Sequence, residues 1–319
     1  MINLGIDRVA DAKLRLDKYL YGALGGYSRT QIQSWIKSGY VLVNNTAVKS
    51  SYTLELNDLI SVRIPDYESD EPELEAQEMD LEIYYEDEYI VVINKPAGLI
   101  VHPGIGNKDG TLVNGLLYYF NSLSKINGRT RPGIVHRLDA ETSGVMVVAK
   151  SNKAHVNLAN QFQYRKVKKK YTAVTWGNWQ EKEGVIDQAI KRKRGDPTVF
   201  TVQSEGKPAL TRYQLVKQFR HLAQVDFFPK TGRTHQIRVH TAWLGNPIFS
   251  DEKYGGGIKK AQGFIPELKR YYTKAMQNFN RHALHAKKLE FIHPMKGDPV
   301  FFQAPLPQEF IDLIAILDD

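Results

Sequence analysis

An acidic, proline-containing stretch divides this chain of 319 residues into a short first part and a long second part. Residues 66–88 contain 12 acidic side chains and no lysine or arginine, and residues 65–73 contain two prolines and little apolar content. Such a composition is typical of a linker and not of a packed element. The sequence therefore predicts a small domain over residues 14–65, an acidic linker over residues 66–79 and a larger domain over residues 80–319.

Outside this stretch the chain is strongly basic. The formal net charge is +8, although a third of the 35 acidic residues lie in the acidic stretch. A basic body is typical of a protein that binds a polyanion such as a nucleic acid; scattered lysines on a soluble protein are the alternative. The chain has no cysteine, which excludes disulfides and thiolate metal sites. It also has no apolar run of signal-peptide or membrane-spanning length, so we expect a cytoplasmic protein without a membrane partner.

The short part predicts two helices followed by a hairpin. Apolar residues recur at helical spacing from Leu16 to Leu24, and Ser28 begins a capping-box pattern that Gln31 completes. Asn44-Asn45 lies between two apolar runs and is a plausible hairpin turn. The second helix has an apolar face and a polar face: Ile32, Trp35 and Ile36 on the first, and Arg29, Gln33 and Lys37 on the second. The polar face either meets phosphates or is simply exposed to solvent.

Three segments of this part together resemble an S4 RNA-binding domain. They are Leu16-Asp17-Lys18-Tyr19-Leu20, Ser28-Arg29-Thr30-Gln31-Ile32 and Ile36-Lys37-Ser38-Gly39-Tyr40-Val41-Leu42-Val43-Asn44. The resemblance implies that the second helix and the following turn contact structured RNA through Arg29, Gln33, Lys37 and Lys49. Because S4 domains occur in several RNA-related proteins, the resemblance implies a class of ligand and not a reaction.

In the long part, a charged loop stands directly before an apolar run that predicts a buried strand. His136-Arg137-Leu138-Asp139 leads through Thr142-Ser143-Gly144 to the apolar residues 145–149. Loop residues held at the end of a rigid strand are often catalytic; an arginine–aspartate pair that only fixes the loop is the alternative. The order His-Arg-Leu-Asp differs from the kinase loop, and neither Asp-Phe-Gly nor a glycine-rich phosphate loop is present, which excludes a kinase.

Two further basic segments follow. Residues 165–170 are mostly lysine and arginine and precede Tyr171, in a run with strand character; these lysines either meet phosphates or protect an exposed strand edge. Residues 234–244 predict a helix with Thr234 as its N-cap, and Arg233 beside that N-terminus suits a phosphate. His235 and His240 are five apart, which does not match zinc-binding spacing on one helix face, so no catalytic metal is expected.

Several short motifs, in order over about residues 80–310, resemble the RluA/RluD group of ribosomal large-subunit pseudouridine synthases. They are Asn94-Lys95-Pro96-Ala97-Gly98, His136-Arg137-Leu138-Asp139 with Thr142-Ser143-Gly144, Lys170-Tyr171, Gly206-Lys207-Pro208-Ala209, Gly232-Arg233-Thr234-His235-Gln236-Ile237-Arg238-Val239-His240 and His285-Ala286-Lys287-Lys288-Leu289. One departure is Val199-Phe200-Thr201-Val202, where the family often has basic residues. RNA contacts of that loop are therefore expected to differ.

The resemblance implies an α+β fold, with a mixed, largely antiparallel sheet in the catalytic domain behind a small S4 domain. It implies that Asp139 is the essential carboxylate, that Tyr171 stacks on the target base and serves as a possible general base, and that Arg238 pairs with Asp139. The substrate-binding residues that it implies are His136, Arg137, Arg233, Leu289 and Lys170. The expected partner is a stem-loop of 23S rRNA, bound by a monomer that needs neither a metal nor a nucleotide cofactor.

Three other functions are compatible with a basic RNA-binding chain. A pseudouridine synthase acting on tRNA would share the same chemistry. A non-catalytic ribosome-assembly protein would have lost Asp139, Tyr171 or Arg238, and all three are present. A metal-dependent RNA hydrolase would use the histidines, and it would lose its activity to a chelator.

Overall fold

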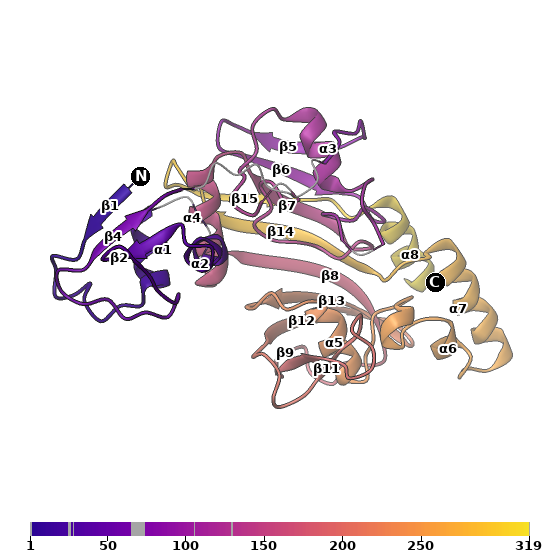
Figure 1. Ribbon diagram of the computed structural model, residues 1–319. Coiled ribbons are helices and arrows are strands. Elements are labelled where there is room, and N and C mark those ends of the chain that lie inside the picture. Colours follow the sequence, from indigo (N-terminus) through magenta and orange to yellow (C-terminus); the bar gives the residue numbers. More distant parts are fainter. Residues whose placement is uncertain are drawn as a thin grey trace.

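The computed structural model describes residues 2–24, 27, 29–64, 74–104, 106–128 and 130–318. The fold is α+β, with a large mixed sheet through the body of the molecule and a small separate sheet in the N-terminal part (Figure 1). The predicted cap at Ser28 and the linker residues up to Glu73 lie outside the described residues. In the part of the chain that is described, no helix is long and apolar enough to cross a membrane.

The N-terminal part has the predicted two helices and hairpin, together with two more strands. Its elements are β1 (Ile2–Gly5), α1 (Leu16–Leu24), α2 (Arg29–Lys37), β2 (Val41–Val43), β3 (Thr46–Ala47) and β4 (Leu59–Val62), with the strands in the order β1-β4-β2-β3. Asn44 and Asn45 have φ of 50° and 64°, as the turn of a two-residue hairpin requires. Ile32, Trp35 and Ile36 are buried, which confirms the predicted apolar face of α2.

A buried carboxylate joins the two helices of this part. Asp17 on α1 is fully buried, and Arg29 Nη2 and Gln33 Nε2 on α2 donate to its Oδ2 at 2.7 and 2.6 Å. Arg15 donates to both of its carboxylate oxygens. Burial acts to raise the pKa of Asp17, but these donors outweigh it and hold that pKa at about 2. Two of the three polar side chains on the predicted RNA face of α2, Arg29 and Gln33, are thus bound to Asp17 within the protein. The third, Lys37, is exposed.

The large sheet passes through the rest of the molecule. In spatial order its strands are β5 (Glu82–Glu86), β6 (Ile90–Lys95), β7 (Ser143–Ala149), β14 (Leu284–Ile292), β8 (Lys168–Trp176), β13 (Leu222–Pro229), β12 (Leu210–Gln218) and β9 (Glu183–Asp187), with β15 (Pro299–Gln303) paired to β14. The pairing of β7 with β14 is parallel, and the other pairings along this order are antiparallel. This confirms the predicted mixed, largely antiparallel sheet.

Helices cover the sheet on both faces. The helix α3 (Leu112–Tyr119) packs on one face of β6 and β7, and α4 (Asn152–Gln163) packs on the other. Strands buried on both faces read as continuous apolar runs, which explains residues 90–93 and 145–149. The remaining elements are β10 (Ile190–Arg192), β11 (Phe200–Val202), α5 (Gln236–Trp243), η1 (Glu252–Tyr254), α6 (Ile258–Ala261), α7 (Pro266–Asn278) and α8 (Gln308–Asp318).

The parallel contact between β7 and β14 places the charged loop near the middle of the sheet. Gly144 has φ of 119°, and a Cβ there would lie 2.3 Å from the carbonyl oxygen of Ala286 on β14. Only glycine allows the two backbones to approach this closely. The loop that ends in Asp139 therefore enters β7 beside β14, next to the strands of the other half of the sheet.

We predict that Asp17→Ala destabilises the N-terminal part. Because the folded pKa of about 2 is lower than the ordinary value, the carboxylate stabilises the fold fully above about pH 4. That contribution, about 2 kcal/mol, is lost as the pH falls from about 4 towards 2. Hydrogen exchange of the amides in α1 and α2 measures it. Asp17→Asn is the matched control and should remove the pH dependence in that window; equal protection in all three proteins at pH 7 would contradict the prediction.

Candidate active site

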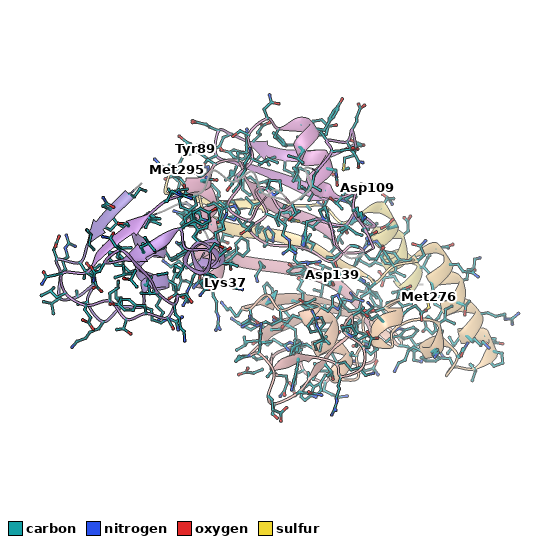
Figure 2. The ribbon with its side chains drawn as sticks, in the orientation of Figure 1. Lys37, Tyr89, Asp109, Asp139, Met276 and Met295 are labelled. Carbon is teal, nitrogen blue, oxygen red and sulfur yellow. The ribbon has the colours of Figure 1, made fainter. Side chains whose placement is uncertain are left out.

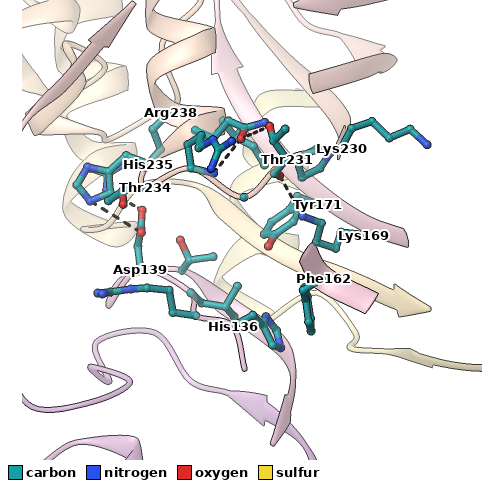
Figure 3. Close-up of a pocket in the computed structure, with 18 of the residues that line it drawn as sticks. His136, Asp139, Phe162, Lys169, Tyr171, Lys230, Thr231, Thr234, His235 and Arg238 are labelled. Carbon is teal, nitrogen blue, oxygen red and sulfur yellow. Dashed lines mark hydrogen bonds and ion pairs between the residues drawn. The ribbon is translucent and has the colours of Figure 1, made fainter. Parts of the chain in front are cut away.

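Asp139 lies near the middle of the molecule, between the part that contains β5–β7 and the part that contains β9–β13 (Figure 2). It lines a cavity of about 560 Å³. The wall is built from four segments and one residue of β14: residues 135–142, the end of α4 with residues that follow it, the start of β8, residues 229–238, which include the start of α5, and Leu284 (Figure 3). The cavity thus joins parts of the chain that are up to about 150 residues apart.

Arg238 holds the carboxylate of Asp139. Its Nη1 donates to Asp139 Oδ2 at 3.0 Å, which confirms the predicted pairing. On its other side Arg238 donates to Asp251, from Nε to Oδ2 at 2.7 Å and from Nη2 to Oδ1 at 2.8 Å. Asp251 is buried, and its side chain also caps η1 by accepting from the amide of Tyr254. One guanidinium is therefore fixed by two carboxylates, in a bidentate pair on one side and a single bond on the other.

The segment before Arg238 differs from the predicted helix start. The helix α5 begins at Gln236, and its N-cap is His235 in the left-handed conformation, with φ of 54°; the predicted cap Thr234 lies one residue earlier. This backbone brings His235 Nε2 to 3.8 Å from Asp139 Oδ1, while Nδ1 is 2.7 Å from the hydroxyl of Tyr254. A positive φ was not predicted at this position because it is uncommon for any residue other than glycine.

The surroundings keep Asp139 ionised. Burial acts to raise the pKa of this carboxyl, but the protonated form of His235 and the guanidinium of Arg238 outweigh burial and hold the pKa below its usual range. Burial lowers the pKa of His235 itself, so that ring is neutral at neutral pH. The guanidinium of Arg238 is therefore the cation that stabilises the carboxylate.

Tyr171 lies on the β8 wall of the cavity. Burial, followed by the nearby charge of Asp139, raises the pKa of its phenol, which stays protonated at neutral pH. The basic side chain that lines the cavity from the same strand is Lys169, which donates to the carbonyl oxygen of Thr231 at 3.0 Å (Figure 3). Burial lowers the pKa of Lys169 to about 8.

Lys170 does not line the cavity, and its role as a substrate contact stays a prediction. Lys170 lies on the opposite side of β8, and its ammonium pairs with Asp226 at 2.7 Å. Side chains alternate along a strand, so the residue two positions before Tyr171 shares its face and the adjacent one does not. Applied to the sequence, this alternation of side chains predicts that Lys169 lies on the same face of β8 as Tyr171.

The prediction of Leu289 as a lining residue is wrong. Leu289 is buried in the apolar cluster with Val145, Val147 and Phe291, away from the cavity. Leu284, five residues earlier on β14, lines the cavity instead. The pairing of β14 with β8 is irregular between Ala286 and Lys288, so the sequence alone does not fix which leucine faces Asp139.

The other predicted residues of this region do line the cavity. His136 stacks on Phe162 at 4.6 Å, and its Nε2 accepts from the amide of Val147 at 3.1 Å; burial lowers its pKa to about 3. Arg137 is exposed at the rim, with Nη1 3.5 Å from His102 Nε2. Arg233 donates from Nε to the carbonyl oxygen of Pro208 at 3.0 Å.

Buried side chains hold the loops around Asp139. The ammonium of Lys95 donates to the carbonyl oxygens of Pro96, Leu99 and Ala140, next to Asp139. Gln236 accepts from the hydroxyl of Thr231 and from the amide of Arg233, which fixes the segment before α5. The cavity is thus formed before any ligand arrives.

Asp251 is the functional residue that the sequence did not reveal. It follows a serine at the end of a loop, without a motif around it, and only the fold brings it against Arg238.

Among the residues that the structure describes, no three histidine, aspartate or glutamate side chains are grouped so as to hold a metal ion.

The chain is similar to known proteins over nearly its whole length. Residues 89–243 match the family described as RNA pseudouridylate synthase, and residues 14–60 match the S4 domain. The chain is 43% identical over 300 residues, which is 94% of this chain and 93% of that protein, to the uncharacterized RNA pseudouridine synthase YlyB of Bacillus subtilis. It is 41% identical over 304 residues, 95% of this chain and 88% of that protein, to ribosomal large subunit pseudouridine synthase D of Xylella fastidiosa.

A solved structure shares the architecture. Human RNA Pseudouridylate Synthase Domain Containing 1 is 28% identical, with a TM-score of 0.55, over 72% of this chain and 84% of that chain.

We predict that Asp251→Ala destabilises the protein by about 3 kcal/mol, because it leaves Arg238 as a buried cation with one partner fewer. Thermal unfolding measures the effect. The matched control is Glu290→Ala, which removes the surface partner of Lys168 and should cost less than about 1 kcal/mol. Equal melting temperatures for the two variants would show that the Arg238–Asp251 pair does not support the fold.

Proposed function

This chain belongs to the family of RNA pseudouridylate synthases, and we propose that it isomerises specific uridines of 23S rRNA with Asp139 as the reacting carboxylate. The enzyme class follows from the family. The rRNA substrate is supported by relatives such as the synthase D of Xylella fastidiosa, whose name refers to the large ribosomal subunit. The observation that carries the role of Asp139 is its position: an ionised carboxylate in a preformed cavity, held by Arg238 and next to Tyr171.

The chemistry of the reaction suits a single carboxylate. Conversion of uridine to pseudouridine breaks a C–N glycosidic bond, turns the base and forms a C–C bond, without redox change or phosphoryl transfer. A carboxylate either attacks the sugar or removes its C2′ proton, and both routes require the ionised form. Arg238 provides that form at neutral pH, so the acid–base state of Asp139 is set before the RNA binds.

Tyr171 has the position and the protonation state of a stacking residue. The target base must leave the RNA stack to reach Asp139, at a cost of a few kcal/mol. Stacking on an aromatic ring returns about 1–3 kcal/mol of this. Because its phenol stays protonated, Tyr171 is better suited to stack and to donate a hydrogen bond than to remove a proton as a general base.

RNA binding is distributed over both parts of the chain. Arg137, Arg233 and Lys169 present positive charge around the cavity, and Lys37 is exposed on α2 of the S4 region. We propose that the S4 domain over residues 14–65 holds the rRNA while residues 80–319 carry out the reaction, and that the protein works as a monomer in the cytoplasm.

We predict that Asp139→Asn and Asp139→Ala make no detectable pseudouridine, since neither side chain carries the charge that the reaction needs. The purified proteins are incubated with a 23S rRNA fragment in the presence of EDTA, and pseudouridine is mapped by carbodiimide-blocked primer extension. Lys108→Ala, an exposed residue that does not line the cavity, is the control and should match the wild type. Primer-extension stops with the wild type and none with the two variants support both the substrate and Asp139.

Other outcomes separate the alternatives. Stops on tRNA and none on 23S rRNA would retain the chemistry and change the substrate. Modification by Asp139→Ala would remove Asp139 from the mechanism. Tight RNA binding by the wild type without modification of any RNA would favour the assembly-protein alternative.

We predict that two substitutions of Tyr171 separate the contribution of its ring to RNA binding from the contribution of its hydroxyl to catalysis. Tyr171→Phe keeps the aromatic ring, so RNA affinity should change by less than about threefold, while kcat falls by about 10² or more if the hydroxyl takes part in proton transfer. Tyr171→Leu also loses stacking, and RNA affinity should fall by about 5-fold or more. Binding is measured by filter retention and kcat under single-turnover conditions. Equal affinity for Tyr171→Leu and the wild type would show that the ring does not stack on the base.

A further inference from the structure

A second cavity of about 570 Å³ lies where the S4 region meets α4 of the catalytic part. Figure 1 shows α2 beside α4, and Tyr21 on α1 donates from its hydroxyl to Asn160 Oδ1 on α4 at 3.3 Å. The described residues around this junction cavity come from α1, from the segment with Tyr27 and Arg29, from residues 126–135, and from α4 with Tyr164. Nothing in the proposed reaction uses it.

The chemistry of the junction cavity suits a nucleotide. Its lining contains three tyrosines, Tyr21, Tyr27 and Tyr164, and two basic residues, Lys18 and Arg29; no acidic side chain is among the described lining residues. Tyr164 is 66% exposed at the rim. Aromatic rings beside positive charge are the combination with which proteins bind unpaired RNA, since each base stacks and each phosphate pairs with a cation.

A buried histidine in the wall has an unused hydrogen-bonding atom. His155 on α4 is only 2% exposed, and its Nδ1 has no hydrogen-bond partner among the residues that the structure describes. Burial lowers the pKa of this ring to about 4, so it is neutral. Buried polar groups in proteins are nearly always paired. His155 lines the cavity, but its unpaired Nδ1 is covered by protein atoms, so only a shift of the surrounding side chains would bring the polar edge of a nucleobase to it.

The junction cavity adjoins the active-site cavity. Val135 and Gln163 line both. Val135 directly precedes His136, and Gln163 follows Phe162, the residue on which His136 stacks. The two cavities therefore lie on either side of shared residues near the end of α4, close enough for one RNA strand to reach both.

We propose that the junction cavity binds an unpaired nucleotide of the same RNA strand whose uridine enters the active site. The tyrosines stack on its base, and Lys18 meets its phosphate. The S4 region then contributes directly to the choice of uridine, in addition to general affinity. This inference rests on the proposed function for the identity of the strand, but the presence of a nucleotide site does not depend on Asp139.

The test uses two exposed residues, so that folding is not affected. The double variant with Lys18→Ala and Tyr164→Ala should bind a fluorescent uridine octamer about 10-fold more weakly and raise KM for the 23S rRNA fragment by a similar factor, with kcat unchanged. The slope of log affinity against log salt concentration should become shallower by about one, as expected for the loss of one phosphate contact. Ala159→Trp, which fills the cavity and removes no polar group, should give the same loss. The matched control is the double variant with Tyr118→Ala and Lys274→Ala, on α3 and α7.

Octamer affinity and KM equal to the wild type in both test variants would overturn the proposal. An equal loss in the control variant would do so as well, because it would show a nonspecific effect of charge. If the wild type modifies no RNA and the octamer still binds more weakly to the test variants than to the control, the site stands and the proposed function fails. If modification is normal and the test variants bind as the wild type does, the proposed function stands and the site fails.

Discussion

The arrangement of the active site depends on one guanidinium placed between two carboxylates. Arg238 binds Asp251 with two short hydrogen bonds and uses its remaining Nη1 for Asp139. Asp251 in turn caps η1, and Tyr254 of η1 contacts His235 at the start of α5. Buried ion pairs often contribute little net stability compared with apolar residues of the same size. The pair of Arg238 with Asp251 instead fixes the direction of Arg238 and, through it, of the Asp139 carboxylate, which must stay charged in the proposed reaction.

This interaction joins the two halves of the large sheet. Asp139 comes from the loop before β7, and Arg238 comes from α5, which packs near β11, β12 and β13. The cavity lies between these halves, and the strands β14 and β8 pass between them. Lys95 holds the loop that carries Asp139, and Gln236 holds the segment before α5. Both segments that meet at the cavity are therefore fixed by hydrogen bonds within the protein.

The sequence predicted the elements and the main partners better than it predicted directions of side chains. The apolar run over residues 145–149 identified β7, and the Asn44-Asn45 hairpin lies where it was expected. The pairing of Arg238 with Asp139 came from a resemblance and is confirmed.

The misses have local physical causes. Side chains alternate along β8, so Lys169 and not Lys170 shares the cavity face with Tyr171. The pairing of β14 is irregular, so sequence spacing does not show that Leu284 lines the cavity in place of Leu289. Asp251 had no signal at all, since no motif surrounds it and its pairing with Arg238, 13 residues earlier, exists only in the folded chain.

The place of β14 in the sheet has a consequence for how the protein is made. This strand comes from residues 284–292, yet it pairs with β7 and β8, which are synthesised more than a hundred residues earlier. Its contacts are therefore strongly non-local, and such contacts form late. On the ribosome the S4 region has its own core and is complete after about the first 64 residues. The walls of the active site, in contrast, remain unjoined until almost the whole chain has emerged, so the enzyme gains an RNA-binding part well before it gains a catalytic one.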